Sequence, residues 1–306
     1  MVNHSRHDFI ELSFVYVCLA VAFVILSSLA MPTATTRFGV IAPQKKEKDK
    51  NISMYNVKAF ENISVRAKAY VVYDILDKKI IASKNSDEVL PLASVTKLMT
   101  AITALTHNNE NTHITISSSS VDGSYDLGLK KNQPWKLGEL LKYTLVFSSN
   151  DGAQAIADNL GGREAFVKTM NTDAILLGLN LHFTQPAGLD INGKLGGEGS
   201  ALEVAKLLAI ARNRFPDILD ATTKTRATVT ADTGRLTGVP NTNQDIVNLL
   251  GAEVSKTGFT DSAGGNLVVV IDLTIGHPVA IVVLGSTKDG RFSDMEILYK
   301  ALLKSL

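Results

Sequence analysis

Residues 91–100 read PLASVTKLMT and contain the tetrapeptide Ser94-Val95-Thr96-Lys97. If Ser94 opens a helix, the side chains of Ser94 and Lys97 share one helix face, and the lysine amine comes within hydrogen-bond reach of the serine hydroxyl. A serine hydroxyl becomes a nucleophile when a neighbouring base takes its proton, and a lysine can be that base when burial or another cation lowers its pKa. Taken alone, the tetrapeptide is more typical of a helix-capping serine followed by an exposed lysine.

A second motif, Ser148-Ser149-Asn150, follows the apolar stretch at residues 140–147. This position predicts a turn at a helix end. The motif offers a hydroxyl and an amide at a fixed separation, which suits proton relay and contact with a substrate backbone. Without other motifs beside it, such a cluster is more typical of an ordinary turn or helix cap.

The third motif is Lys256-Thr257-Gly258, followed by Phe259 and a turn that leads into another apolar strand. It predicts a β-hairpin whose first strand carries a cation, a hydroxyl and a glycine. The cation and the hydroxyl can bind a carboxylate, and a glycine in a strand lets another backbone approach closely. In isolation, the lysine is better read as a solvated residue on an edge strand.

Hydrophobic periodicity predicts strands at both ends of the main domain and helices between them. We expect an α/β fold of the α+β type, in which an early hairpin and late strands form one antiparallel sheet covered by helices. A mostly helical lobe forms the rest, and the cleft between sheet and lobe is a natural ligand site. The expected hairpin lies at 70–82, the later strands at 267–273 and 279–284, and the helices at 94–105, 137–147, 153–160, 163–177, 201–212 and 293–303.

Composition excludes several functional classes. The net charge of +1 over 306 residues offers no basic surface for nucleic acid. Cys18 is the single cysteine, so the chain forms no intramolecular disulfide, and the six histidines show no metal-ligand spacing. We therefore expect neither a metal nor an organic cofactor.

Residues 12–31 form an uncharged apolar run as long as the hydrocarbon core of a bilayer is thick. We expect a retained transmembrane anchor, with a cleaved signal segment as the alternative because Ser28-Leu29-Ala30 resembles a cleavage site. Basic residues follow the run, against the positive-inside rule. The orientation is therefore taken from the expected chemistry, which places the main domain outside the cytoplasm, membrane-bound or secreted.

The three motifs occur together in the order found in penicillin-binding proteins and class A β-lactamases. Over residues 67–302 the sequence resembles the D-alanyl-D-alanine carboxypeptidases, which are low-molecular-mass penicillin-binding proteins. Residues 91–100, 182–190 (HFTQPAGLD), 241–243 (NTN) and 256–260 (KTGFT) carry the likeness, with Met170-Asn171. The resemblance implies the β-lactamase/transpeptidase-like fold.

The resemblance also implies roles for individual residues, and these roles are expectations. Ser94 attacks the carbonyl between two D-alanines of a peptidoglycan stem peptide, Lys97 is the general base, Ser148 relays a proton, and Asn150 holds Lys97 and the substrate amide. The substrate-binding residues are Lys256 and Thr257 on the terminal carboxylate, Gly258, and Phe259, whose N–H joins that of Ser94 in an oxyanion hole. β-Lactams are the expected inhibitors.

The resulting layout has a tail at 1–11, an anchor or signal segment at 12–31, a linker at 32–60 and a catalytic domain at 61–306. The sheet lobe takes about 61–95 and 245–306, and the helical lobe about 96–244. Relatives often have Gly or Ala at Ser149 and Ala at Gly152, and many continue into a C-terminal β-domain and membrane helix, so this chain is expected to be a minimal version.

Rival functions are a D,D-endopeptidase acting on cross-links, a catalytically inactive peptidoglycan-binding protein, and a β-lactamase or esterase. The sequence lacks the Glu-x-x-Leu-Asn motif of class A β-lactamases. The endopeptidase shares all three motifs with the carboxypeptidase, so the motifs do not separate the two.

Overall fold

The computed structural model describes residues 54–120, 126 and 129–306. Its centre is a five-stranded antiparallel sheet with the order β10-β11-β12-β1-β2. The strands are β1 Ala69–Asp74, β2 Lys79–Lys84, β10 Ala252–Thr260, β11 Gly264–Asp272 and β12 Pro278–Ser286. The sheet therefore joins the early hairpin to the late strands, as predicted, and β10 lies at its edge.

Side chains of the central strands alternate between two hydrophobic clusters, because successive residues of a strand point to opposite faces. On β11, Val268 and Val270 belong to the cluster on the helical side. Leu267, Val269 and Ile271 belong to the cluster on the other side. Each buried aliphatic side chain contributes about 1.5–3 kcal/mol, so apolar burial holds helices against both faces of this sheet.

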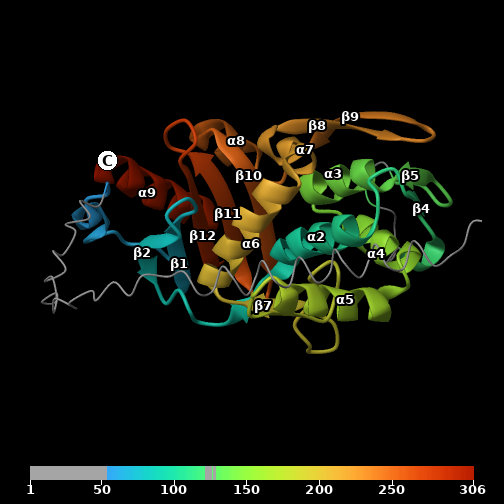
Figure 1. Cartoon of the computed structure of the whole chain (residues 1–306), viewed down its shortest axis with the longest axis horizontal. Helices are drawn as coiled ribbons and strands as arrows, with labels where there is room; N and C mark the ends of the chain where they lie inside the picture. Colours follow the sequence, from blue (N-terminus) through green and yellow to red (C-terminus); the bar gives the residue numbers. More distant parts are fainter. Residues whose placement is uncertain (1–53, 121–125, 127–128) are drawn as a thin grey trace, which may run out of the picture. The chain divides into compact units, whose positions relative to one another are not determined.

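Helices cover both faces of the sheet (Figure 1). The C-terminal helix α9 packs on one face, and α6 packs against β1 and β12 on the other. The helices are α2 Lys97–His107, α3 Leu137–Phe147, α4 Asn150–Asn159, α5 Arg163–Leu176, α6 Ala201–Arg214, α7 Pro216–Leu219, α8 Gln244–Leu250 and α9 Gly290–Ser305, with 3₁₀ turns η1 Val57–Phe60, η2 Ala93–Thr96, η3 Ser118–Ser120 and η4 Asp220–Thr223.

The predicted fold class, an antiparallel sheet flanked by helices with a mostly helical lobe, is confirmed. Short strands that the periodicity did not predict complete the lobe. They are β3 Leu90–Pro91, β4 His113–Thr115, β5 Pro134–Lys136, β6 Leu181–Phe183, β7 Gly197–Gly199, β8 Arg226–Ala231 and β9 Gly234–Pro240. The hairpin β8–β9 was missed because alternating Thr and small residues form a weak apolar signal.

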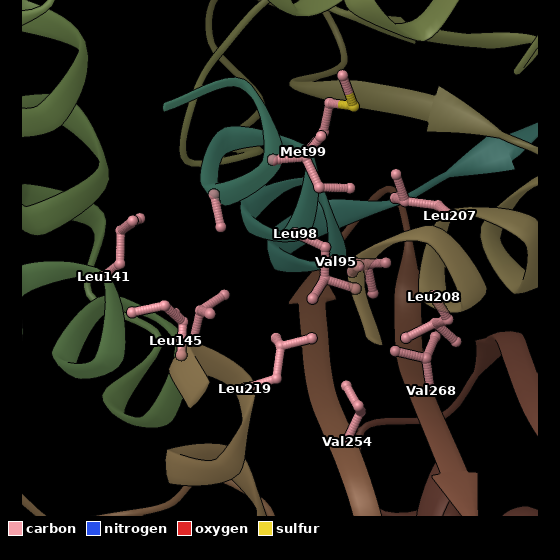
Figure 2. Packing of buried hydrophobic residues seen from close by; sticks show 14 of the residues in the cluster. Val95, Leu98, Met99, Leu141, Leu145, Leu207, Leu208, Leu219, Val254 and Val268 are labelled. Carbon is pink, nitrogen blue, oxygen red and sulfur yellow. The ribbon is translucent and has the colours of Figure 1, made fainter. Parts of the chain in front are cut away.

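Helix α2 lies at the centre of the core, and its residues from Lys97 to Ala104 are all buried. Figure 2 shows Val95 and Leu98 packed among side chains of β10, β11, α3 and α6. A helix buried on all sides is held by packing rather than by its own helix propensity. The start of α2 is therefore fixed from several directions.

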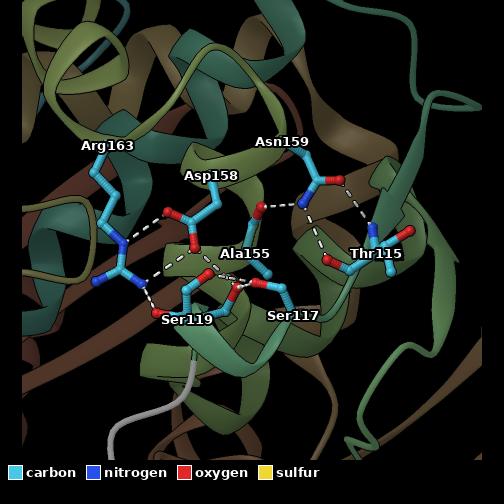
Figure 3. A network of polar contacts seen from close by, with 8 residues as sticks. Thr115, Ser117, Ser119, Ala155, Asp158, Asn159 and Arg163 are labelled. Carbon is cyan, nitrogen blue, oxygen red and sulfur yellow. Dashed lines mark hydrogen bonds and ion pairs between the residues drawn. The ribbon is translucent and has the colours of Figure 1, made fainter.

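Polar contacts hold the C-terminal end of α4 (Figure 3). The Arg163 guanidinium donates from Nε to Asp158 Oδ1 at 2.8 Å and from Nη2 to Asp158 Oδ2 at 3.1 Å. Asn159 donates to the Thr115 carbonyl oxygen at 3.0 Å and accepts from the Thr115 N–H at 3.1 Å. Because α4 begins at Asn150, these contacts fix the far end of the helix that carries this residue.

The predicted linker at 32–60 extends too far along the chain. Residues 54–60 pack on the domain: Phe60 is buried, the Asn56 N–H donates to the Ser305 carbonyl oxygen, and the Tyr55 hydroxyl donates to Asp74 at 2.9 Å. The scattered apolar residues of this segment gave no periodic signal. The tail, the apolar run at 12–31 and the rest of the linker lie outside the described residues and stay predictions.

Within the part of the chain that the structure describes, no helix combines the length and the apolar character needed to cross a membrane. The described residues also contain no group of His, Cys, Asp or Glu side chains arranged to hold a metal ion.

Substitution of two glycines with positive φ can distinguish the free-energy cost of a steric clash from that of backbone strain. A Cβ at Gly188, where φ is +76°, would lie 2.0 Å from the Ala93 carbonyl oxygen, whereas Gly178, where φ is +71°, has open space around it. The left-handed conformation costs an L-residue about 1–2 kcal/mol. We expect Gly178→Ala to lose about that much unfolding free energy and Gly188→Ala at least about 1 kcal/mol more. Urea unfolding followed by circular dichroism measures both, and equal losses would contradict the close approach.

Candidate active site

Ser94 and Lys97 lie one above the other at the junction of η2 and α2. The sequence predicted an α-helix starting at Ser94, but the structure has a 3₁₀ turn there. A 3₁₀ turn has three residues per turn, so the side chains of residues i and i+3 lie directly above one another. The Lys97 Nζ donates to Ser94 Oγ at 2.8 Å. Ala93, just before the serine, has φ +48°, which is a strained value for a residue with a Cβ. The turn therefore places the hydroxyl and the amine in contact at the cost of local strain.

Lys97 is fully buried, and its amine has three hydrogen-bond partners. Besides Ser94, it donates to Asn150 Oδ1 at 2.8 Å and to the Ala187 carbonyl oxygen at 2.7 Å. Burial lowers the pKa of Lys97 to about 7, and the Asp126 carboxylate opposes this shift. A substantial fraction of this amine is therefore neutral near neutral pH. The neutral amine has two N–H groups, which can serve Asn150 and Ala187, and a lone pair that can accept the Ser94 proton.

Ser148 and Lys256 form a second hydroxyl–amine pair. Ser148 ends α3 in the left-handed conformation, with φ 64°, on the predicted turn. The Lys256 Nζ donates to Ser148 Oγ and to the Thr257 carbonyl oxygen, each at 2.8 Å. Lys256 is fully buried, not a solvated edge residue, and burial together with the cations of Lys97 and Arg291 lowers its pKa well below the ordinary value.

Ser149 and Gly152 have structural roles beside the second motif. Ser149 caps α4 by accepting from the Gly152 N–H at 2.8 Å, and its hydroxyl donates to Asp126 Oδ2 at 2.6 Å. A Cβ at Gly152 would lie 2.3 Å from Thr144 Oγ1. The glycine therefore leaves room for the Thr144 hydroxyl, and the serine holds in place the carboxylate that acts on Lys97.

Gly258 brings β10 directly against the turn that carries Ser94. A Cβ at this position would lie 2.8 Å from the Leu92 carbonyl oxygen and 3.2 Å from the Ser94 nitrogen. The buried Arg291 of α9 donates from Nη1 to the Gly258 carbonyl oxygen at 2.7 Å. The backbone N–H groups of Ser94 and Phe259 thus belong to two adjoining segments, as an oxyanion hole requires.

Thr257 and Phe259 complete the strand side of the site. The Thr257 hydroxyl lies 2.6 Å from the Thr242 hydroxyl. Phe259 is 40% exposed, and the Lys288 Nζ lies 5.4 Å from the centre of its ring in a cation–π contact. The structure therefore joins Ser94, Lys97 and Asn150 in one set of contacts and Ser148 and Lys256 in another. Thr257, Gly258 and Phe259 follow Lys256 on β10.

Several residues of the site were given no role by the sequence. Asp190 accepts from the Thr260 hydroxyl at 2.7 Å, and Asn266 Nδ2 donates to the Pro91 carbonyl oxygen at 2.9 Å. Ala187, Asp190 and Thr242 lie in segments that carried the resemblance, which was a usable signal. Arg291 follows a glycine at the start of α9 and had no sequence signal at all.

The arrangement has the parts of a serine acyl-transfer site. One hydroxyl contacts a buried amine that can accept its proton, and a second hydroxyl–amine pair lies beside it. The adjoining strand offers a backbone N–H and a hydroxyl to a substrate. The chemistry that these groups support is attack on a carbonyl carbon.

Comparisons with known proteins agree with this geometry. Residues 56–288 match the family described as D-alanyl-D-alanine carboxypeptidase. A D-alanyl-D-alanine endopeptidase of Haemophilus influenzae is 35% identical over 210 residues, which cover 67% of this chain and 70% of the relative. A D-alanyl-D-alanine carboxypeptidase of Mycobacterium tuberculosis is 28% identical over 199 residues, which cover 64% of this chain and 67% of the relative.

A solved structure shares the fold. Penicillin-binding protein D2 of Listeria monocytogenes, crystallised in its cefotaxime-bound form, aligns with a TM-score of 0.69 and 28% identity, over 79% of this chain and 99% of that chain. The family match covers well over half of the chain, including all three motifs. The chain therefore belongs to the D-alanyl-D-alanine carboxypeptidase family of serine peptidases.

Proposed function

We propose that this protein removes the terminal D-alanine from peptidoglycan stem peptides through an acyl-enzyme on Ser94. The observation that carries the proposal is the contact between Ser94 Oγ and the buried Lys97 amine at 2.8 Å. Burial gives this lysine a pKa of about 7, so it can serve as a base without a histidine or a metal.

The acylation step uses the first hydroxyl–amine pair. Ser94 Oγ attacks the carbonyl carbon between the two D-alanines, and its proton passes to Lys97 Nζ. The oxyanion that forms accepts hydrogen bonds from the N–H groups of Ser94 and Phe259. As the C–N bond breaks, the proton taken by Lys97 reaches the leaving nitrogen, and the Ser148 hydroxyl relays it. D-Alanine departs and leaves an ester on Ser94.

Lys256 prepares Ser148 for this relay. Its Nζ donates to Ser148 Oγ, so the hydroxyl proton of Ser148 is directed elsewhere and can point to the leaving nitrogen. In the second half of the reaction a water molecule attacks the ester carbonyl carbon and Lys97 accepts a proton from it. Lys97 returns this proton to Ser94 Oγ as the C–O bond breaks, and the shortened peptide departs.

The D,D-endopeptidase activity is the second candidate, because the relative named D-alanyl-D-alanine endopeptidase is 35% identical and the relative named carboxypeptidase is 28% identical. The two activities share the acyl-enzyme and differ in what the leaving amine carries. An inactive binding protein is disfavoured, because both hydroxyl–amine pairs keep hydrogen-bonding geometry.

The proposal includes a place of action outside the cytoplasm, where stem peptides lie, with residues 12–31 as the membrane anchor. The uncharged apolar character of that run supports it.

Ser94→Ala should abolish covalent labelling by a fluorescent β-lactam, because the β-lactam carbonyl acylates the same hydroxyl as the substrate. Intact-mass analysis should show one adduct on the wild type and none on the variant. Ser118→Ala, at an exposed serine of η3, is the matched control and should label normally. An adduct on the Ser94→Ala protein would show that another residue is the nucleophile.

The rate of β-lactam acylation should rise with pH and level off above about pH 7, because Lys97, with its pKa of about 7, accepts a proton only in its neutral form. Asp126→Asn should move this rise to lower pH, since the carboxylate favours the charged amine. The measurement is the second-order acylation rate constant from pH 5 to pH 9, at intervals of about one pH unit. Asp217→Asn, at an exposed position on α7, should leave the profile in place. A rate independent of pH would remove Lys97 from the role of base.

Amidation of the substrate's terminal carboxylate should lower kcat/KM by roughly 10- to 150-fold, because a hydrogen bond to a charged group contributes about 1.5–3 kcal/mol. Thr257→Val should reduce this discrimination, since it removes the hydroxyl and keeps the shape. Mass analysis of a pentapeptide and of a cross-linked dimer, incubated side by side, completes the test. Equal turnover of acid and amide, with faster cleavage of the dimer, would favour the endopeptidase.

A further inference from the structure

We propose that Thr242 is a positioning residue that turns the Thr257 hydroxyl proton toward the carboxylate of the leaving group. The inference rests on the proposed function and deepens it, because it names a specificity determinant outside the three motifs. Its starting point is the 2.6 Å contact between the Thr242 and Thr257 hydroxyl oxygens.

The contact leaves two possible arrangements of protons, because a hydroxyl has one proton and two lone pairs. If Thr257 donates to Thr242, it can present only lone pairs to a substrate. If Thr242 donates to Thr257, the Thr257 proton is free to point into the site. An ionised carboxylate only accepts hydrogen bonds. A substrate carboxylate therefore selects the arrangement in which Thr242 is the donor.

The neighbouring cations make this hydroxyl important. The Lys256 amine is directed to Ser148 Oγ and to the Thr257 carbonyl oxygen, and Arg291 Nη1 is directed to the Gly258 carbonyl oxygen. These N–H groups hold the strand and the relay serine in place. The Thr257 hydroxyl is a further donor on β10 that can face a carboxylate.

Thr242 is held to β10 from one side. Asn241 Nδ2 donates to the carbonyl oxygens of Thr222 and Lys224, each at 2.9 Å. Thr222 in turn meets Ser255 of β10 twice: its hydroxyl accepts from the Ser255 N–H at 3.1 Å, and its carbonyl oxygen accepts from the Ser255 hydroxyl at 3.0 Å. The segment with Thr242 is thus tied to the strand that carries Thr257.

A second anchor ties the same residue to α3. The Thr242 N–H donates to the Val146 carbonyl oxygen at 3.2 Å, two residues before Ser148. Thr242 itself is exposed, whereas Thr257 is only 3% exposed. The Thr242 side chain therefore borders the site from outside and reaches the more deeply placed Thr257 hydroxyl from a backbone fixed on two sides.

The arrangement predicts a loss that depends on the substrate's charge. Thr242→Val removes the donor, leaves the Thr257 hydroxyl free to rotate, and removes the polarisation that one hydroxyl gives the next. We expect the ratio of kcat/KM for the acid substrate to kcat/KM for its amide to fall by about 2- to 10-fold, the size of one neutral hydrogen bond. Thr242→Ser keeps the donor and should restore the ratio.

The experiment measures kcat and KM on paired acid and amide peptides for the wild type, Thr242→Val, Thr242→Ser and the control Thr172→Val. Thr172 lies on α5, and its exposed hydroxyl donates to the Lys168 carbonyl oxygen at 3.0 Å, so the control loses a comparable hydrogen bond outside the site. Thermal unfolding of each variant shows whether the fold is kept.

The outcomes are distinct. A lower acid-to-amide ratio in Thr242→Val, restored in Thr242→Ser and unchanged in Thr172→Val, supports the proposal. Equal ratios in the wild type and a folded Thr242→Val protein overturn it, as does a fall in Thr242→Ser as large as in Thr242→Val. Absence of Ser94-dependent turnover of either peptide by the wild type would instead overturn the proposed function, so the two failures are separate results.

Discussion

The burial of the Lys97 amine is the constraint on which the rest of the site depends. Removing an amine from water favours its neutral form, and three acceptors from three segments surround it: Ser94, Asn150 and the Ala187 carbonyl oxygen. Two of these segments approach most closely at Gly188, where a Cβ would lie 2.0 Å from the carbonyl oxygen of Ala93, the residue before Ser94. The packing of these segments therefore fixes both the position of the nucleophile and the burial of its base.

A second buried amine makes the site electrostatically coupled. Lys256 lies near enough to Lys97 and Arg291 for both to lower its pKa, on top of the effect of burial. Two neighbouring ammonium groups without water cost more than one, so protonation of either amine disfavours protonation of the other. Asp126 acts in the opposite direction on Lys97. The balance between these charges sets how much free base is present before substrate arrives.

The parts of the site that depend on the spacing of neighbouring residues could be predicted from the sequence. The spacing of Ser94 and Lys97 gives one helix face, and Ser148 ends an apolar helix, so both placements were predictable. Lys256 was expected on an edge strand, which is right, and its role toward the substrate carboxylate stays a prediction. Its contact with Ser148 Oγ was not predictable, because α3 and β10 meet only in the folded chain. Backbone acceptors and partners such as Arg291 have no sequence pattern for the same reason.

The limits of the motifs also explain why two activities share this family. The motif residues form and break the acyl bond, and that chemistry is the same whether the leaving amine is a free D-alanine or part of a cross-link. What differs is the group attached to the leaving nitrogen. In this chain the exposed Thr242 lies beside Thr257, on a segment tied to both α3 and β10. The shared chemistry of the motifs does not by itself select between small and large leaving groups, so that selection has to come from residues beside the motifs.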